Sequence, residues 1–317
     1  MFNNLRELIT TMPDEKTCRE FLADQRWHCN VVCPHCDCAK TYVIEGGKRY
    51  KCGNSECYKK FSVTTGTIFH ASNIPITKWF MAIYITTAHK KGISTYQLAK
   101  DIGTSQKTAW FMMHRIRESL RDTNFELIKG TVEIDETYIG GKMKNKNKKL
   151  RKANAENQQS STLNKVGVMG MLERKEGIKM QVMDENKPFK EIVKQNVSFS
   201  STVITDNAAF YKGLDKNYKA HEIVNHIEDE FVRGQWHTNS VEGAFGLFKR
   251  MIIGIYHQVS AKHLSRYCDE FTYRYNSRKL KDADRFLITL QRIERRLTYK
   301  NLVYNGKSTQ ENKNSQA

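Results

Sequence analysis

Apolar residues recur along the chain with two different spacings, and these spacings predict where helices and strands lie. The helical spacing of three to four residues recurs in residues 1–25, 75–91, 94–100, 105–120, 188–196, 237–250 and 264–276. Short apolar runs rich in β-branched residues predict strands over residues 131–139, 166–172, 178–183, 202–206 and 221–226. Residues 61–69 are also β-prone.

One long segment lacks either spacing. Residues 142–165 are polar and cationic, which predicts a disordered basic insertion. Such an insertion could clamp a phosphate backbone, or it could be a solvated loop. Its candidate DNA contacts are Lys144, Lys146, Lys148, Lys149 and Arg151.

The net charge of the chain indicates what kind of molecule it binds. The chain has 317 residues, 52 Lys and Arg, 34 Asp and Glu, and a net charge of +18. A pI near 9.5 indicates a polyanionic partner, most simply nucleic acid, although ribosomal-type binding or a membrane surface would also suit it. No apolar run reaches the roughly 18 residues of a membrane span, and the first residues do not form a secretory signal. We therefore expect a cytoplasmic protein.

Cysteines cluster in one short stretch. Cys33 and Cys36 form one close pair, and Cys52 and Cys57 form another, with an alternating segment between the pairs. Two such pairs are the layout of a zinc ribbon, in which four thiolates hold one structural Zn²⁺ in a reducing compartment. The spare candidates Cys29, His35 and Cys38 could replace a ligand or could only pack beside it.

Two predicted helices after the ribbon are joined by a tight turn at residues 101–103, as in a helix-turn-helix. Ser94 with Gln97 indicates a capping box for the first helix, and Thr104 or Ser105 would cap the second. The early residues of the second helix are the candidate DNA contacts: Ser105, Gln106, Lys107 and Thr108. An ordinary helical hairpin is the alternative.

Residues 237–250 carry a carboxylate and a cation on one helical face. Glu242 and Lys249 are two turns apart, about 10 Å along the axis, and Gly246 between them has no side chain. This spacing suits a metal-bound phosphodiester. Alternatively, Asn239 is an N-cap and Glu242 its partner in a capping box.

The order of elements in the second half predicts a ribonuclease-H-like fold. Three strands in a meander are followed by a helix, a fourth strand, a helical segment, a fifth strand and a helix, which gives a mixed five-stranded sheet. Asp135 lies within the first strand, Asp206 ends the fourth, and Glu242 lies on the late helix. Three acids brought together can hold two Mg²⁺ ions, roughly 4 Å apart.

Taken together, these motifs resemble a zinc-ribbon-headed bacterial insertion-sequence transposase with a DDE catalytic domain. The resemblance covers residues 30–280 and rests on the two cysteine pairs and on residues 61–69, 132–142, 203–207, 237–250 and 256–276. The domains expected from it are a helical lead (1–27), a zinc ribbon (28–65), a helix-turn-helix (75–122), a DDE domain (125–280) and a C-terminal helix with a polar tail (281–317).

The resemblance also implies an activity. Asp135 and Asp206 would be ligands of Mg²⁺ or Mn²⁺, with Glu242 or Asn239 as the third ligand. Lys249 would contact the DNA phosphate, and His237 could orient a phosphate or be a surface residue. The implied reaction is hydrolysis at the transposon end followed by strand transfer, by a homodimer or larger synaptic complex on double-stranded DNA, without a nucleotide cofactor. A DNA-binding regulator with an inactive catalytic domain is the rival reading.

Overall fold

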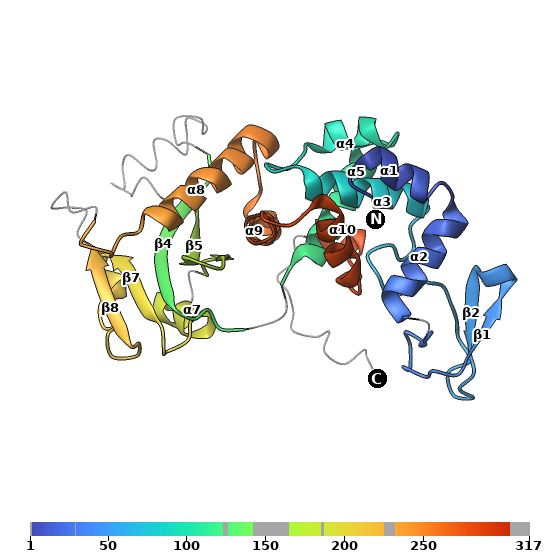
Figure 1. Cartoon of the computed structure of the whole chain (residues 1–317), viewed down its shortest axis with the longest axis horizontal. Coiled ribbons are helices and arrows are strands. Elements are labelled where there is room, and N and C mark those ends of the chain that lie inside the picture. Colours follow the sequence, from blue (N-terminus) through green and yellow to red (C-terminus); the bar gives the residue numbers. More distant parts are fainter. Residues whose placement is uncertain are drawn as a thin grey trace.

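The computed structural model describes residues 2–28, 30–122, 126–141, 165–184, 187–224 and 232–304. It is an α+β protein with a three-stranded sheet near the N-terminus and a mixed five-stranded sheet in the second half. Figure 1 shows the large sheet at one end of the molecule and the small sheet at the other, with a group of helices between them. None of the helices within the described residues is long and apolar enough to cross a membrane.

The N-terminal third has the predicted helical lead and ribbon. Its elements are α1 (Leu5–Thr11), α2 (Glu15–Trp27), β1 (Thr41–Ile44), η1 (Glu45–Gly47), β2 (Arg49–Cys52) and β3 (Lys60–Phe61). Each helix begins at a polar side chain that accepts a backbone N–H, Asn4 from Glu7 and Asp14 from Thr17. Trp27, at the end of α2, packs on Tyr50 and Phe61 and so joins the helices to the ribbon.

The β-prone stretch 61–69 is not a strand beyond Phe61, and that expectation was wrong. Side-chain hydroxyls compete for the backbone there: Thr65 Oγ1 accepts the N–H of Ser62, and the Thr67 hydroxyl donates to the carbonyl of Thr64. Gly66 follows with φ +80°, a conformation that ends an extended run. Local hydroxyl bonding therefore overrides the β propensity of these residues.

Three helices follow the ribbon, as predicted. They are α3 (Ile76–Ala88), α4 (Thr95–Asp101) and α5 (Gln106–Leu120). Ser94 caps α4 by accepting the N–H of Gln97, but the Gln97 side chain donates to Asp101 rather than back to the cap, so only half of the predicted capping box forms. Apart from its first turn, α5 is buried almost all round, because it lies between α3, α9 and α10.

The large sheet has the strand order β6-β5-β4-β7-β8. Its strands are β4 (Thr131–Ile139), β5 (Val166–Glu173), β6 (Ile178–Val182), β7 (Thr202–Asp206) and β8 (Ala220–Val224). β4 pairs antiparallel with β5 and parallel with β7, which is the order of the predicted ribonuclease-H-like fold. Residues 142–164 of the predicted insertion 142–165 lie outside the described residues, as do the last two residues of the predicted fifth strand.

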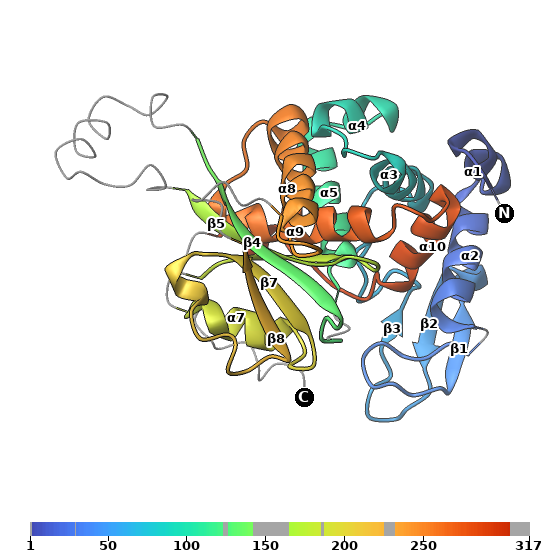
Figure 2. The same cartoon turned by 60° about the vertical axis from the view of Figure 1, so that its left-hand side comes forward.

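Helices cover both faces of this sheet. α8 (Asn239–Met251) and α9 (Ala261–Asn276) lie on one face, and α7 (Phe189–Asn196) with the short turn η3 (Ala209–Tyr211) lies on the other. Figure 2 shows α8 crossing over β4 and β5 with α7 beneath them. Because strand side chains alternate, β5 contributes to both cores: Val168 packs under α8, and Met169 packs over α7.

Helix α9 also covers the outer edge of β6. The Asn276 amide binds both the N–H and the C=O of Ile178, and Thr272 accepts the N–H of Met180. These side chains take the place of a further strand. The sheet edge at β6 is therefore not left open to pairing with another chain.

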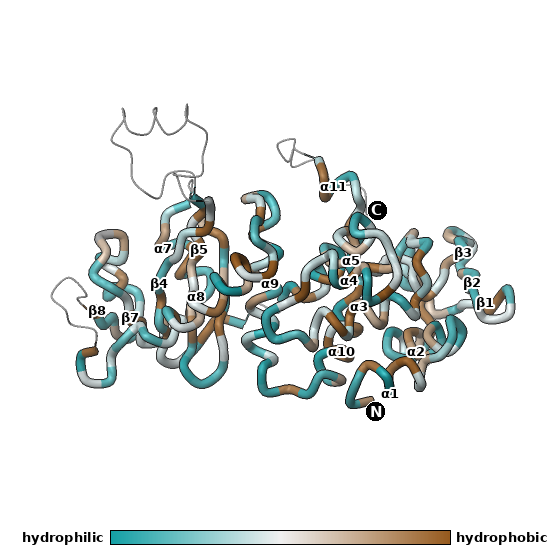
Figure 3. Tube along the Cα trace, turned by 90° about the horizontal axis from the view of Figure 1, so that it is seen from above, coloured by the Kyte–Doolittle hydropathy of each residue, from teal (hydrophilic) through white to brown (hydrophobic). Residues whose placement is uncertain are grey.

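The chain after α9 returns to the N-terminal helices. α10 (Asp282–Gln291) packs against α2, α3 and α5, and Phe286 is fully buried in their core. Beyond it, the Ile293 carbonyl accepts the N–H of Ile68, and α11 (Tyr299–Val303) places Tyr299 against Phe111 of α5. Figure 3 shows apolar positions gathered where α3, α5 and α10 meet.

A buried ionic group joins the two halves. Arg117 of α5 and Glu270 of α9, both fully buried, form an ion pair of 2.7 Å. Arg274 lies 2.5 Å from the other oxygen of Glu270, and the Tyr256 hydroxyl donates to that oxygen at 2.7 Å. Tyr256 ends η5 (Ile252–Tyr256), a π-helical turn that continues α8. The group thus connects the helix after the tight turn with the helix that bears Glu242.

Candidate active site and metal centre

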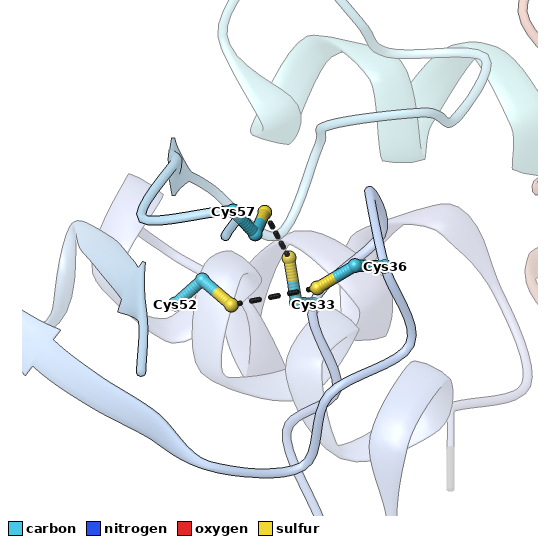
Figure 4. A group of neighbouring side chains, drawn as sticks. All are labelled: Cys33, Cys36, Cys52 and Cys57. Carbon is cyan, nitrogen blue, oxygen red and sulfur yellow. Dashed lines mark hydrogen bonds between the residues drawn. The ribbon is translucent and has the colours of Figure 1, made fainter. Parts of the chain in front are cut away.

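Four cysteine thiols meet in the ribbon, as the two close pairs predicted. The Sγ atoms of Cys33, Cys36, Cys52 and Cys57 all lie within 4.8 Å of one another. Figure 4 shows them converging from two loops. Four sulfur ligands in a closed set are the donor set of a structural Zn²⁺ site. Cys38 lies outside this set with its thiol near the Lys40 carbonyl, and Cys29 is outside the described residues.

Asp135 and Asp206 lie on adjacent parallel strands at the same level. Thr131 is opposite Thr202 and Glu133 is opposite Ile204, and this register continued by two residues places Asp135 beside Asp206. Side chains at the same level of neighbouring strands point to the same face, with the strands about 4.8 Å apart. The strand register thus brings the two predicted aspartates together.

Helix α8 lies close above these strands because of a glycine. Gly170 of β5 is opposite Asp135 in the sheet. A Cβ atom at Gly170 would lie 2.8 Å from the ring of Phe245 and 3.0 Å from a methyl of Val241. The absence of a side chain at this one position therefore allows the buried stripe of α8 to approach the strand next to Asp135.

The exposed face of α8 carries the other predicted residues. Val241, Phe245 and Phe248 are buried, whereas Glu242 and Lys249 are exposed, as the helical spacing predicted. The capping-box interpretation of this helix was wrong. Thr238 is the N-cap, Asn239 is the exposed first residue of the helix, and the Thr238 hydroxyl donates to the Glu242 carboxylate at 2.9 Å.

A buried carboxylate that the sequence analysis missed caps α8 instead. Glu133 of β4 accepts the N–H groups of Ser240 at 2.9 Å and Val241 at 3.0 Å, and the Ser240 hydroxyl at 3.0 Å. It is fully buried and also accepts from Arg174 at 2.7 Å. A carboxylate at the first turn of a helix satisfies the unpaired N–H groups and complements the helix dipole. Its position two residues before Asp135, on the same strand face, was the available signal.

Arg174 links the Glu133 carboxylate to the segment before α8. Its guanidinium donates to the carbonyls of Gln235 at 2.7 Å and His237 at 3.2 Å. His237 Nδ1 lies 3.4 Å from the Glu133 carboxylate. His237 therefore lies beside the buried Glu133 carboxylate at the start of α8.

The three acids interact electrostatically. Burial is the main cause that raises the pKa of Asp135 to about 7, and a hydrogen bond of 2.8 Å from the Glu136 amide opposes the rise. The negative charges of Glu136, Asp206 and Glu242 raise the pKa of Asp135 further. Like-charged carboxylates that interact in this way repel one another, and a bound cation would relieve the repulsion. Their oxygens are the donors that Mg²⁺ prefers.

Glu136, next to Asp135, points to the opposite face of the sheet. Its carboxylate accepts the hydroxyl of the buried Tyr211 at 2.9 Å. Burial raises the pKa of Glu136, the hydrogen bond from Tyr211 lowers it, and the charge of Asp206 raises it. A fourth carboxylate thus lies within electrostatic range of the candidate site, and strand alternation alone could have shown its direction.

The candidate DNA contacts of the helix-turn-helix fall into two groups. Ser105 caps α5 by accepting the N–H of Thr108, and Gln106 donates to Thr95 of α4, so these three residues bind within the motif. Lys107 is exposed, with its ammonium 5.6 Å from the ring centroid of Tyr299. The lysines and arginine predicted between 144 and 151 lie outside the described residues.

Two family descriptions match the chain. A transposase zinc-ribbon domain matches residues 13–60, and an ISXO2-like transposase domain matches residues 127–276. The chain belongs to the zinc-ribbon transposases of insertion sequences. These transposase domains cover the four cysteines and all three candidate acids.

A curated relative supports the assignment. The chain is 28% identical over 279 residues to an uncharacterized protein in transposable element ISH50 of Halobacterium salinarum, with 84% of this chain and 92% of the relative covered. No solved structure matches the chain significantly.

Proposed function

We propose that this transposase binds the terminal inverted repeats of its insertion sequence and catalyses metal-dependent DNA cleavage and strand transfer, with Asp135, Asp206 and Glu242 as the metal ligands. The observation that carries the proposal is the strand register that puts Asp135 level with Asp206. The effect of the Glu242 charge on the pKa of Asp135 supports Glu242 as the third member.

The residues fit two Mg²⁺ or Mn²⁺ ions. The donors are carboxylate oxygens, and their mutual repulsion favours a cation between them. When bound, such ions activate a water or a 3′-hydroxyl and stabilise the leaving oxygen. Glu133 holds the start of α8 against β4, so the chain itself fixes the distance between Glu242 and Asp135. Lys249, two turns further along the exposed face of α8, would contact the phosphate of the transposon end.

DNA recognition is proposed for the helix-turn-helix formed by α4 and α5 and for the ribbon. The first turn of α5 carries Lys107 on its exposed side, and the net charge of +18 favours a polyanion. Two transposon ends have to be brought together for strand transfer. A homodimer or larger synaptic complex is therefore part of the proposal.

A strand-transfer assay tests the catalytic proposal. The purified protein is incubated with Mg²⁺, a duplex that ends in the inverted repeat and a target plasmid, and joined products are scored. We expect joined products with the wild type and none with Asp206→Asn, which keeps the shape of the side chain and removes its charge. Equal inactivity of both proteins under conditions in which both bind the repeat would contradict the enzyme reading and favour a DNA-binding regulator. Nicked products without joined ones would identify a nuclease.

A further inference from the structure

The small sheet of the ribbon has two faces of different chemistry. Val43, Tyr50 and Phe61 lie level across its three strands. Tyr50 and Phe61 stack on each other with centroids 5.5 Å apart, and both pack on Trp27 of α2 at 5.2 and 6.1 Å. This inner face attaches the ribbon to the rest of the protein.

The neighbouring row of residues across the same three strands points to the opposite face of the sheet. Tyr42 is opposite Lys51, and Lys51 is opposite Lys60, so these three residues form a row across the strands. Because successive strand residues alternate in direction, the row lies on the face opposite to Tyr50 and Phe61. Tyr42 is 51% exposed, and the Lys51 ammonium lies 4.6 Å from the ring centroid of Tyr58, which is 57% exposed.

The protein leaves the charge of this row unbalanced. Lysines directly opposite each other on neighbouring strands repel, which destabilises the sheet when no anion is near. Within the described residues the ribbon has one ion pair, between Arg49 and Glu45 at 3.6 Å, and neither residue belongs to the row. Lys51 and Lys60 form no ion pair with any part of the chain that the structure describes. An external anion would neutralise both lysines.

We infer that the outer ribbon face, formed by Tyr42, Lys51, Tyr58 and Lys60, binds the phosphate backbone of duplex DNA. The two ammonium groups supply charge, and the two exposed phenols supply hydroxyl donors and flat apolar rings beside them. The inference rests on the proposed function for the identity of the polyanion as DNA. Figure 1 shows the ribbon at the far end of the molecule from the sheet that carries Asp135, so this face contacts DNA away from the active site of its own chain.

A salt titration of DNA binding tests the inference. Lys51→Gln with Lys60→Gln is compared with a matched control, Lys16→Gln with Lys187→Gln, which removes two exposed lysines elsewhere. Loss of two phosphate contacts lowers the slope of log affinity against log salt by about two. We expect that change and about a tenfold loss of affinity in the ribbon variant alone, with zinc content unchanged and no fall in melting temperature in either variant. A slope equal to that of the control overturns the inference.

Two further measurements, binding to an unrelated duplex and the oligomeric state, show whether the loss of affinity comes from phosphate contacts. Phosphate contacts carry no sequence information, so binding to an unrelated duplex should weaken by the same factor as binding to the inverted repeat. A loss confined to the repeat would mean that this face reads bases, and a changed oligomeric state with an unchanged slope would mean that it joins copies of the chain; either result overturns the inference. Wild-type protein that binds DNA without joining it contradicts the catalytic proposal and leaves this inference standing.

Discussion

The buried carboxylate of Glu133 accepts the backbone N–H of Val241 at 3.0 Å, and this contact joins the central strand β4 to the first turn of α8. Glu133→Gln replaces a charged acceptor by a neutral amide and leaves Arg174 without its anionic partner. We expect the free energy of unfolding to fall by about 1–3 kcal/mol. Urea denaturation measures this change, and Glu191→Gln, on the exposed face of α7, should alter it by less than about 0.5 kcal/mol.

The third metal ligand can be assigned by two substitutions on α8. Glu242→Gln removes a charge that acts on Asp135, so we expect strand transfer to fall by about a hundredfold or more. Asn239→Ala changes an exposed residue and should keep activity within about threefold. The reverse pattern would assign the position to Asn239. Circular dichroism spectra of both variants should match that of the wild type.

Replacing a glycine by alanine should change the stability in opposite directions at Gly170, under α8, and at Gly246, on α8 itself. Gly170→Ala places a methyl 2.8 Å from the Phe245 ring, and such overpacking costs about 1–3 kcal/mol. Gly246→Ala adds a methyl where nothing lies within 4 Å, so helix propensity should stabilise the protein by about 0.5–1 kcal/mol. Thermal unfolding of both variants measures the two effects. A gain of stability in Gly170→Ala would show that α8 does not approach the strand this closely.

Zinc should hold the ribbon together. Cys52→Ser removes a buried member of the four-thiol cluster, and we expect the variant to lose the single bound zinc and the order of the ribbon. Metal analysis after mild chelation measures zinc per chain, and proteolysis reports the order of the ribbon. Cys38→Ser, outside the cluster, is the control and should keep one zinc. Equal zinc content in the two variants would remove Cys52 from the site.

The ionic group between α5 and α9 should give the protein an acid-sensitive stability. Burial alone would raise the pKa of Glu270, but Arg117 and Arg274 hold it at about 2, below its ordinary value of 4.5. A carboxyl group whose pKa is lowered by folding stabilises the protein at pH values above its ordinary pKa of 4.5, and this contribution is lost as the pH falls toward about 2. We expect the free energy of unfolding to decrease across that window.

The matched variant for this prediction replaces all three charges. Arg117→Met, Glu270→Met and Arg274→Met together fill the space with apolar side chains and avoid leaving a buried charge unpaired, which would cost about 3–5 kcal/mol. Its stability should depend less on pH between about 4.5 and 2 than that of the wild type. Identical pH profiles of the two proteins would show that Glu270 does not contribute the acid sensitivity.

Features set by local spacing were predictable from the sequence. The strand from Thr131 to Ile139 was placed correctly because β-branched residues recur along it, with Val132 and Ile134 at alternate positions. The close approach of the four cysteines followed from two short loops in one ribbon. The level positions of Asp135 and Asp206 depend on the register of β4 against β7, two strands that the predicted fold makes neighbours.

Features that depend on distant contacts were not predictable. Nothing in residues 237–250 reveals that the cap of α8 comes from Glu133, more than a hundred residues earlier. Asn239 and Glu242 satisfied the local capping pattern, but the buried carboxylate of Glu133 had already met the N–H groups of Ser240 and Val241. The strand predicted after Phe61 was wrong for a different reason: the side-chain hydroxyls of Thr65 and Thr67 bind the local backbone.

The return of α10 to the N-terminal helices has a consequence for synthesis. Phe286 and Leu290 fill a core that otherwise belongs to α2, α3 and α5, so the N-terminal helical unit is completed by residues that the ribosome adds after the five-stranded sheet. A nascent chain that has made only the ribbon and the first helices therefore exposes an unfilled apolar groove. Under the DNA-binding role proposed for α4 and α5, fragments that stop before α10 would not compete with the whole protein for transposon ends, because they lack residues that complete the core of this unit.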